Sequence, residues 1–163
     1  MRKSIFKAGK KYTFSDYFKM GHPPEEILAE FGYSFALEQL VLPMAEEIDQ
    51  SEVERLRISY YQLVTKVSLN SETAKRELMV VPLLHSLVKQ VNAKLNIEYP
   101  LNIDDKLSGL IDYLFRGTQE LLVIEAKKGD MEQGFNQLAA EMVAVDKYDT
   151  NNSLTAQSSR RIP

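Results

Sequence analysis

The chain has 163 residues, of which 44% are hydrophobic and 26% are charged, and its formal net charge is −3. This length fits one domain, and without a long apolar run or a hydrophobic signal core we expect a cytoplasmic protein with no membrane association. The chain has no cysteine, which excludes disulfides, a thiol nucleophile and a thiolate metal site, and its acidic balance counts against a strong non-specific DNA binder.

Residues 1–50 are expected to form a helical, aromatic-rich N-terminal extension. Thr13 predicts the cap of a short helix over 14–20. Two prolines followed by two glutamates predict a second helix that starts at Pro24 and ends at Gly32. The aromatic side chains of this region predict a small hydrophobic cluster rather than a stacking platform for bases, because no basic residues alternate with the rings.

Two helices are predicted to open the second region, a nuclease-like core over residues 51–148. A capping box followed by apolar residues at helical spacing predicts a helix near 51–69, and this helix should lie on the core. Ser71 predicts the cap of a longer helix near 71–95, with a kink or an interruption at Pro82.

Three short apolar runs follow and predict the strands of a sheet. An edge-leaning strand is expected over 97–101. Two central strands are expected over 110–115 and 121–126, because these runs are apolar on both faces. A two-residue loop at 117–118 would join the central strands into a hairpin.

Three charged residues interrupt or end the two central strands: Asp112 in the first, and Glu125 and Lys127 in the second. Charges in buried strands are costly unless they are paired or hold a metal. With the two-residue loop, Asp112 faces Val123 and lies on the same face as Glu125, one diagonal step of roughly 7–8 Å away. Two carboxylates at that separation can share a divalent cation, with Lys127 beside them.

A further helix is predicted to start after Asp130 and to reach about Tyr148. Gln137 and Glu141 project from one side of this helix, and we expect that side to be solvated. The opposite side should be a buried stripe made of Phe135, Leu138, Ala139, Met142 and Val143. The remaining residues, 149–163, form a polar tail that we expect to be disordered or truncated.

An Asp in one strand, followed after a turn by Glu-x-Lys in the next, is the pattern of the PD-(D/E)XK nuclease superfamily, and Asp112, Glu125 and Lys127 resemble it. The surrounding sequence is similar to the nuclease domain of type I restriction-enzyme R subunits over about 71–148. The similar segments are an opening helix and two active-site strands, at 71–76, 98–101, 109–113 and 124–128. The family fold continues with another core strand, which is not apparent in 149–163. By this resemblance, either the chain is a truncated or frame-shifted copy, or residues 153–162 form a poor substitute for that strand.

The resemblance implies an α/β (α+β) fold, with a restriction-endonuclease-like mixed sheet flanked by helices. It implies that Asp112 and Glu125 hold Mg²⁺ or Mn²⁺ through oxygen ligands, and that Lys127 orients the attacking water or stabilises charge on phosphorus. Glu72 would add a carboxylate near the metal, although a favourable interaction with the helix dipole is its other interpretation. Gln137 would help to bind DNA or to orient the lysine.

Together these residues predict a metal-dependent endonuclease, a hydrolase that cuts DNA phosphodiester bonds. The sequence has no Gly-x-x-x-x-Gly-Lys stretch, so an ATP-driven translocase would be another protein. Two other interpretations stay open: a catalytically inactive nuclease-fold binding or interaction module, and a structural domain in which Glu125 and Lys127 form a surface ion pair. Besides DNA, a protein partner or a second copy in a homodimer is left open.

Overall fold

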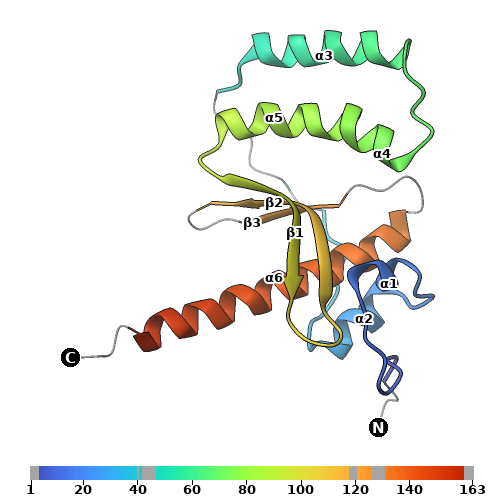
Figure 1. Ribbon diagram of the computed structural model, residues 1–163, viewed down its shortest axis with the longest axis vertical. Helices are drawn as coiled ribbons and strands as arrows, with labels where there is room; N and C mark the ends of the chain where they lie inside the picture. Colours follow the sequence, from blue (N-terminus) through green and yellow to red (C-terminus); the bar gives the residue numbers. More distant parts are fainter. Residues whose placement is uncertain (1–3, 40, 42–46, 118–120, 126–130, 160–163) are drawn as a thin grey trace.

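A three-stranded antiparallel sheet in the order β1-β2-β3 forms the centre of the fold (Figure 1). The computed structural model describes residues 4–39, 41, 47–117, 121–125 and 131–159. Its strands are β1 (Lys94–Asn102), β2 (Ser108–Arg116) and β3 (Leu121–Ile124). The α+β class is as predicted, but the mixed sheet is wrong for these strands, because the short connections between them allow only antiparallel pairing.

The β2–β3 hairpin is confirmed, but its loop is longer than predicted. Arg116 pairs with Leu121, so the loop spans 117–120 and not 117–118. A two-residue loop would have placed the polar residues Gln119 and Glu120 opposite the apolar end of β2, whereas the observed register begins β3 at a leucine. The difference is an even number of residues, so it leaves the predicted faces of the side chains unchanged.

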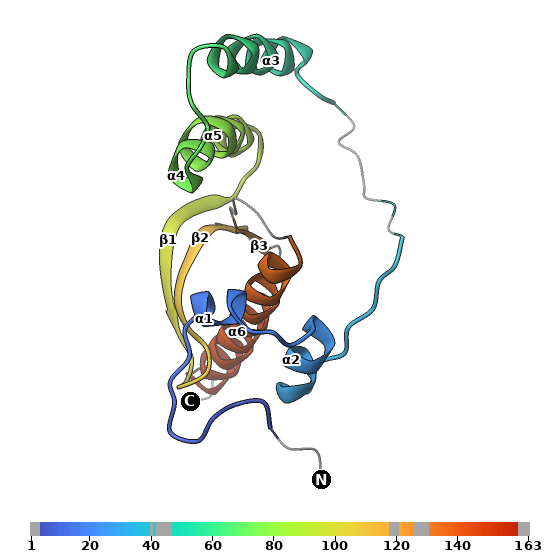
Figure 2. The ribbon, with the colours of Figure 1, turned by 90° about the vertical axis from the view of Figure 1, so that its right-hand side faces the viewer.

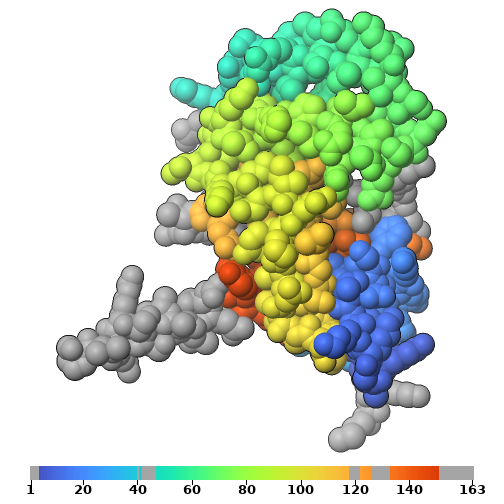
Figure 3. Space-filling view, viewed as in Figure 1, coloured from blue at the N-terminus to red at the C-terminus, as the bar shows by residue number. Residues whose placement is uncertain are grey.

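On one side the sheet packs against α6 (Met131–Ser159) and the N-terminal helices α1 (Phe14–Phe18) and α2 (Pro24–Glu30) (Figure 1). The buried side chains that form this main core are Tyr12, Phe14, Tyr17, Ile27, Leu101, Leu107, Ile111, Leu114, Ala140, Val143, Ala144 and Val145. The aromatic cluster is thus confirmed, and it is continuous with the core of the sheet. Figure 3 shows the N-terminal segment lying against the strands.

Local signals form the two N-terminal helices where the sequence predicts them. The Thr13 amide donates a hydrogen bond of 2.8 Å to the Asp16 carboxylate at the start of α1. Pro24 begins α2, and Gly32 follows its end with a φ of +84°, a conformation that favours glycine.

Hydrogen bonds join the N-terminal segment to the β1–β2 hairpin. The Tyr17 hydroxyl donates to the Lys106 carbonyl at 2.6 Å. The Ser108 hydroxyl donates to the Tyr12 carbonyl at 3.1 Å. These bonds link residues about 90 positions apart in the chain and tie the segment around α1 to the sheet.

A broken helix covers the other side of the sheet. It consists of α4 (Glu72–Lys75), the π-helical stretch η1 (Arg76–Val80) and α5 (Val81–Gln90). The predicted interruption lies directly before Pro82, which has no amide hydrogen and would clash with the carbonyl of the preceding turn. The wider π turn accommodates the proline. Ser71 caps the start, as predicted.

A second, smaller core lies between α5 and the sheet. Leu84 packs there with Tyr113 and Phe115, and partly buried residues such as Val81 and Ile124 surround them. The sheet is therefore flanked by helices on both sides.

The helix α3 (Gln50–Val64) does not lie on the core, contrary to the prediction. It stacks on α5 at one end of the molecule (Figure 2), and none of its side chains is buried. Two hydrogen bonds connect it to the broken helix. The Tyr60 hydroxyl donates to the Met79 carbonyl at 2.6 Å, and the Ser86 hydroxyl donates to the Glu52 carboxylate at 2.9 Å.

Two helix ends also differ from the prediction. Asp49 caps α3 by accepting hydrogen bonds from the amides of Ser51 and Glu52 at 2.9 and 3.3 Å, in place of the predicted capping box. The helix α6 runs on to Ser159, so the backbone of the predicted polar tail is helical up to that residue. None of the helices in the described ranges is long and apolar enough to cross a membrane.

Candidate functional site

The register of the hairpin brings Asp112 and Glu125 close to each other. Leu114 pairs with Val123, and both side chains pack in or against the main core. Asp112 and Glu125 lie two residues beyond this pair in their two segments, and regular alternation along the strands would place both on that face. The same register, continued by one residue beyond the last β2–β3 pair, sets them directly opposite each other. This relation is closer than the diagonal one that the sequence predicts.

Gln137 of α6 connects this pair to a further carboxylate. Its amide nitrogen donates one hydrogen bond of 2.7 Å to Glu125 Oε1 and another of 2.9 Å to Glu141 Oε1. The nitrogen has two hydrogens, so both are used on carboxylates. The position of the Glu125 carboxylate is thus set by a side chain from the helix that crosses the sheet.

The face of α6 that meets the sheet differs in part from the one that the sequence predicts, although Val143 is buried as expected. Gln137 and Glu141, expected on a solvated side, are only 3% and 0% exposed. Phe135 and Met142, expected in the buried stripe, are 51% and 58% exposed. Small residues such as Ala140 lie beside the two polar side chains on the buried face, and small residues let the helix approach the sheet closely.

The buried position of Glu141 changes its titration. Burial raises the pKa of Glu141 to about 9. The adjacent Glu125 carboxylate and the more distant Asp112 carboxylate raise this pKa further, whereas the hydrogen bond from Gln137 opposes the rise. The electrostatic influence of both Asp112 and Glu125 on Glu141 indicates that three acidic side chains belong to one site.

Arg76 lies at the edge of this site. Its guanidinium is 3.6 Å from the Asp112 carboxylate and 3.4 Å from that of Glu98, which occupies the position opposite Asp112 in β1. Burial lowers the pKa of Arg76, but Asp112 and other neighbouring groups outweigh burial, and the pKa is raised overall. Glu98 has a φ of +49°, an uncommon conformation for a residue other than glycine that occurs often at functional sites.

Glu72 and Lys127 are the remaining predicted site residues. Glu72 is exposed in the first turn of α4, one helical turn before Arg76. Lys127 lies outside the described residues, so its predicted role stays a prediction. No group of three or more acidic or histidine side chains is arranged to hold a metal ion within the described ranges.

The side-chain oxygens of this site nevertheless fit a hard cation such as Mg²⁺. The buried Gln137 Oε1 accepts no hydrogen bond from the residues that the structure describes. Carboxylate and amide oxygens are the ligands that Mg²⁺ and similar cations prefer. A buried acceptor without a donor costs free energy. A cation bound at this site would remove that cost by binding to the oxygen.

Sequence reasoning missed Arg76, Glu98 and the role of Glu141. Gln137 and Glu141 are four residues apart, which puts them on one helical face, but this spacing alone does not say whether the face is wet or buried. The opposite placement of Glu98 and Asp112 follows only from the β1–β2 register. Arg76 reaches Asp112 from a different layer of the fold, and no local pattern in the sequence indicates that contact.

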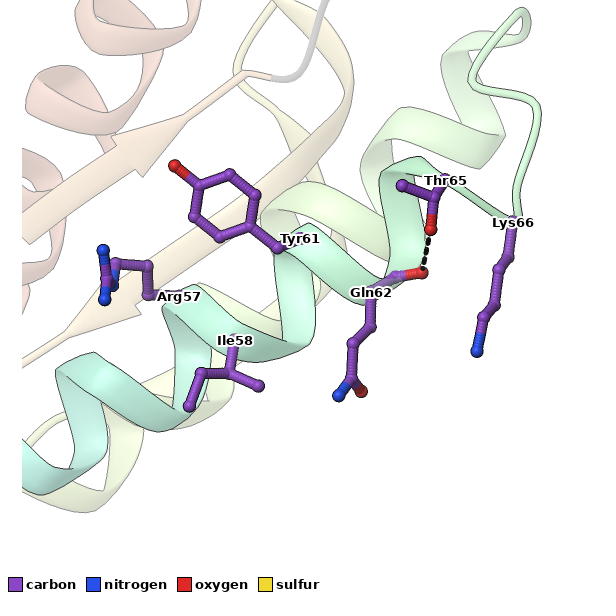
Figure 4. Close-up of a pocket in the computed structure, with 6 residues that line it drawn as sticks. All are labelled: Arg57, Ile58, Tyr61, Gln62, Thr65 and Lys66. Carbon is purple, nitrogen blue, oxygen red and sulfur yellow. Dashed lines mark hydrogen bonds between the residues drawn. The ribbon is translucent and has the colours of Figure 1, made fainter.

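Two hollows of the surface lie away from these carboxylates. One, of about 380 Å³, lies on α3 and the turn after it, and Figure 4 shows the side chains that line it: Arg57, Ile58, Tyr61, Gln62, Thr65 and Lys66. The other, of about 420 Å³, is a largely apolar groove between α2 and α6. Neither is lined by a candidate site residue, so neither bears on the chemistry of the acidic site.

No model of a protein family, no curated protein and no solved structure matches the chain. Its function has to be inferred from the residues and the geometry described above.

Proposed function

We propose that the chain is a metal-dependent endonuclease-like domain that hydrolyses DNA phosphodiester bonds, with a sheet and helices related to those of restriction endonucleases. The observation that carries the proposal is the β2–β3 register: Tyr113 pairs with Ile124, so the next residues, Asp112 and Glu125, lie close together at the end of the ladder. An aspartate in one strand and a Glu-x-Lys sequence after the next strand form the active-site pattern of the PD-(D/E)XK nucleases, which the chain resembles. The proposed partner is DNA.

In this proposal Asp112 and Glu125 would hold Mg²⁺ or Mn²⁺. When bound, the cation would polarise the phosphodiester and lower the pKa of a bound water. Gln137 holds one oxygen of Glu125 through its 2.7 Å hydrogen bond, which limits the freedom of the ligand. Lys127, by its resemblance, would orient the attacking water or stabilise charge on phosphorus.

A second candidate is a nuclease-like domain that binds nucleic acid or protein without cutting. The ion pair between Arg76 and Asp112 favours it, because a carboxylate paired with a guanidinium is a poorer cation ligand. In an active site, Arg76 would have to exchange Asp112 for a phosphate oxygen, for which its fork of donors is well suited.

Cleavage of supercoiled plasmid in Mg²⁺ or Mn²⁺ tests the proposal. Lys127→Ala should lower the rate of cleavage by roughly 10²–10³-fold, the usual cost of removing a group that stabilises the transition state. Lys128→Ala, a matched change at the next residue, should retain cleavage. Circular dichroism of both variants checks that the fold is kept.

The outcome that contradicts the proposal is an absence of metal-dependent cleavage, or equal rates for the wild type and Lys127→Ala. The binding candidate then remains. It predicts that Lys127→Ala lowers DNA affinity modestly and reduces the salt dependence of binding by about one phosphate contact.

A further inference from the structure

We infer that Glu141 is an additional cation ligand, and that the cation of this site is held between the carboxylates of Glu125 and Glu141 with Gln137 beside them. The choice of a divalent metal ion as the ligand rests on the proposed function. It adds a ligand from α6, a helix in which the sequence predicts no metal-binding carboxylate.

The first reason is the position of the Gln137 amide nitrogen. It lies between two carboxylates, 2.7 Å from Glu125 Oε1 and 2.9 Å from Glu141 Oε1. Two carboxylates drawn to one positive centre are the arrangement that a divalent cation requires, and here the partly positive NH₂ group occupies that place. A cation would take over the attraction that the amide now provides.

The second reason is a buried acceptor that has no donor. Glu141 is fully buried and Gln137 is only 3% exposed. Gln137 Oε1 accepts no hydrogen bond from the described residues, and Glu141 shares its own proton with Glu125, a proton that a cation would displace. Buried acceptors are normally satisfied, and a cation satisfies carboxylate and amide oxygens together. Turning the Gln137 amide over would bring its oxygen to the place that the nitrogen now has.

The third reason concerns Asp112. This carboxylate lies 3.6 Å from the Arg76 guanidinium, whereas the pair formed by Glu125 and Glu141 has Gln137 as its bridging donor. Mg²⁺ is commonly bound through one or two carboxylates, with waters filling the remaining positions, so Glu125 and Glu141 can hold the cation while Asp112 is paired with Arg76.

Isothermal titration calorimetry with Mn²⁺, in the absence of DNA, tests the inference. Glu141→Gln keeps the size of the side chain but cannot release a proton to become a carboxylate ligand, and it should weaken Mn²⁺ binding by about tenfold or more. The matched control is Asp146→Asn, which removes one charge from an exposed position of α6 and should leave Mn²⁺ affinity unchanged.

A double-mutant cycle separates a shared ligand from an effect on the fold. Glu125→Gln should weaken Mn²⁺ binding as Glu141→Gln does, and the double variant should lose less than the sum of the two single losses, because both carboxylates bind one ion. Additive losses, Mn²⁺ binding by Glu141→Gln equal to that of the wild type, or no Mn²⁺ binding by the wild type would each overturn the inference.

The additional ligand and the proposed nuclease function can be refuted by different results. Wild-type binding that is insensitive to Glu141→Gln, together with metal-dependent cleavage, would refute the additional ligand and leave the nuclease. Binding that depends on Glu141, without cleavage of DNA, would support the ligand and refute the nuclease.

Discussion

Glu141 is a buried acid whose raised pKa has a consequence for stability. In the unfolded chain its pKa lies near the ordinary 4.5, and in the folded protein it lies near 9. Between these values the folded state holds a proton that the unfolded state has lost. The contribution of Glu141 to stability is therefore fully present below about pH 4.5 and is lost as the pH rises through about 9, with a slope of at most about 1.4 kcal/mol per pH unit.

Urea unfolding from pH 5.5 to 8.5 measures this effect. The Glu141→Gln variant carries a neutral side chain of the same size, so its free energy of unfolding should fall less steeply with pH than that of the wild type. The free energy of unfolding of the variant, relative to that of the wild type, should therefore increase as the pH rises. Parallel pH dependences would contradict the assignment of the slope to Glu141.

The helix α3 differs from the other long helices because it has no buried side chain. Its Tyr60 hydroxyl bonds to the Met79 carbonyl, and a net hydrogen bond contributes about 1 kcal/mol. Tyr60→Phe should therefore speed amide exchange in α3 about fivefold and leave exchange in β2 unchanged, because the helix opens locally. Hydrogen exchange followed by mass spectrometry measures both elements.

Tyr61→Phe is the control for that change. The neighbouring Tyr61 side chain is exposed and lines the surface hollow on α3 (Figure 4). Removing its hydroxyl should not alter the exchange of α3. Equal acceleration by both substitutions would show that the Tyr60 hydrogen bond does not hold the helix.

Local signals account for the elements that the sequence predicts well. Ser71 and Pro24 mark helix starts through caps and a fixed φ, and these effects act within a few residues. The face of α6 is different. Both of its sides carry apolar residues, and only the sheet decides that Ala140 and Glu141 face inward while Met142 faces water. The spacing of apolar residues predicts a helix, but it does not say which of two partly apolar faces is buried.

The whole molecule depends on the fit between its N-terminal helix and the sheet. Gly109 has a φ of +144°, and a Cβ atom there would lie 2.9 Å from Cδ2 of the buried Phe14 ring. Gly109→Ala should therefore destabilise the protein by about 1–3 kcal/mol, through crowding and backbone strain. Thermal or chemical unfolding measures the loss.

Gly21→Ala provides the comparison, because a Cβ atom at Gly21 would meet no atom within 4 Å. This change should alter stability by less than about 1 kcal/mol, and the smaller freedom of the unfolded chain favours the variant. If Gly109→Ala were equally mild, the N-terminal helix would not press on β2 as the structure describes.

Contacts between distant parts of the chain explain what the sequence could not predict at this scale. The aromatic residues before Gly32 predict a cluster, but nothing near Phe14 or Tyr17 indicates that their partners are Ala140 and Ala144. The same holds for the site. The sequence identifies Asp112 and Glu125, but it does not predict which side chains from other layers of the fold lie beside them.

The sharing of one core between the N-terminal aromatic residues and α6 has a consequence for synthesis. A chain leaves the ribosome from its N-terminus, so Phe14 and Tyr17 emerge well before the α6 residues that share their core. Until α6 has emerged, these aromatic side chains have no apolar surface from it to cover them. The nascent chain must carry them exposed while the intervening residues are made, and the core closes in one late step over a long loop.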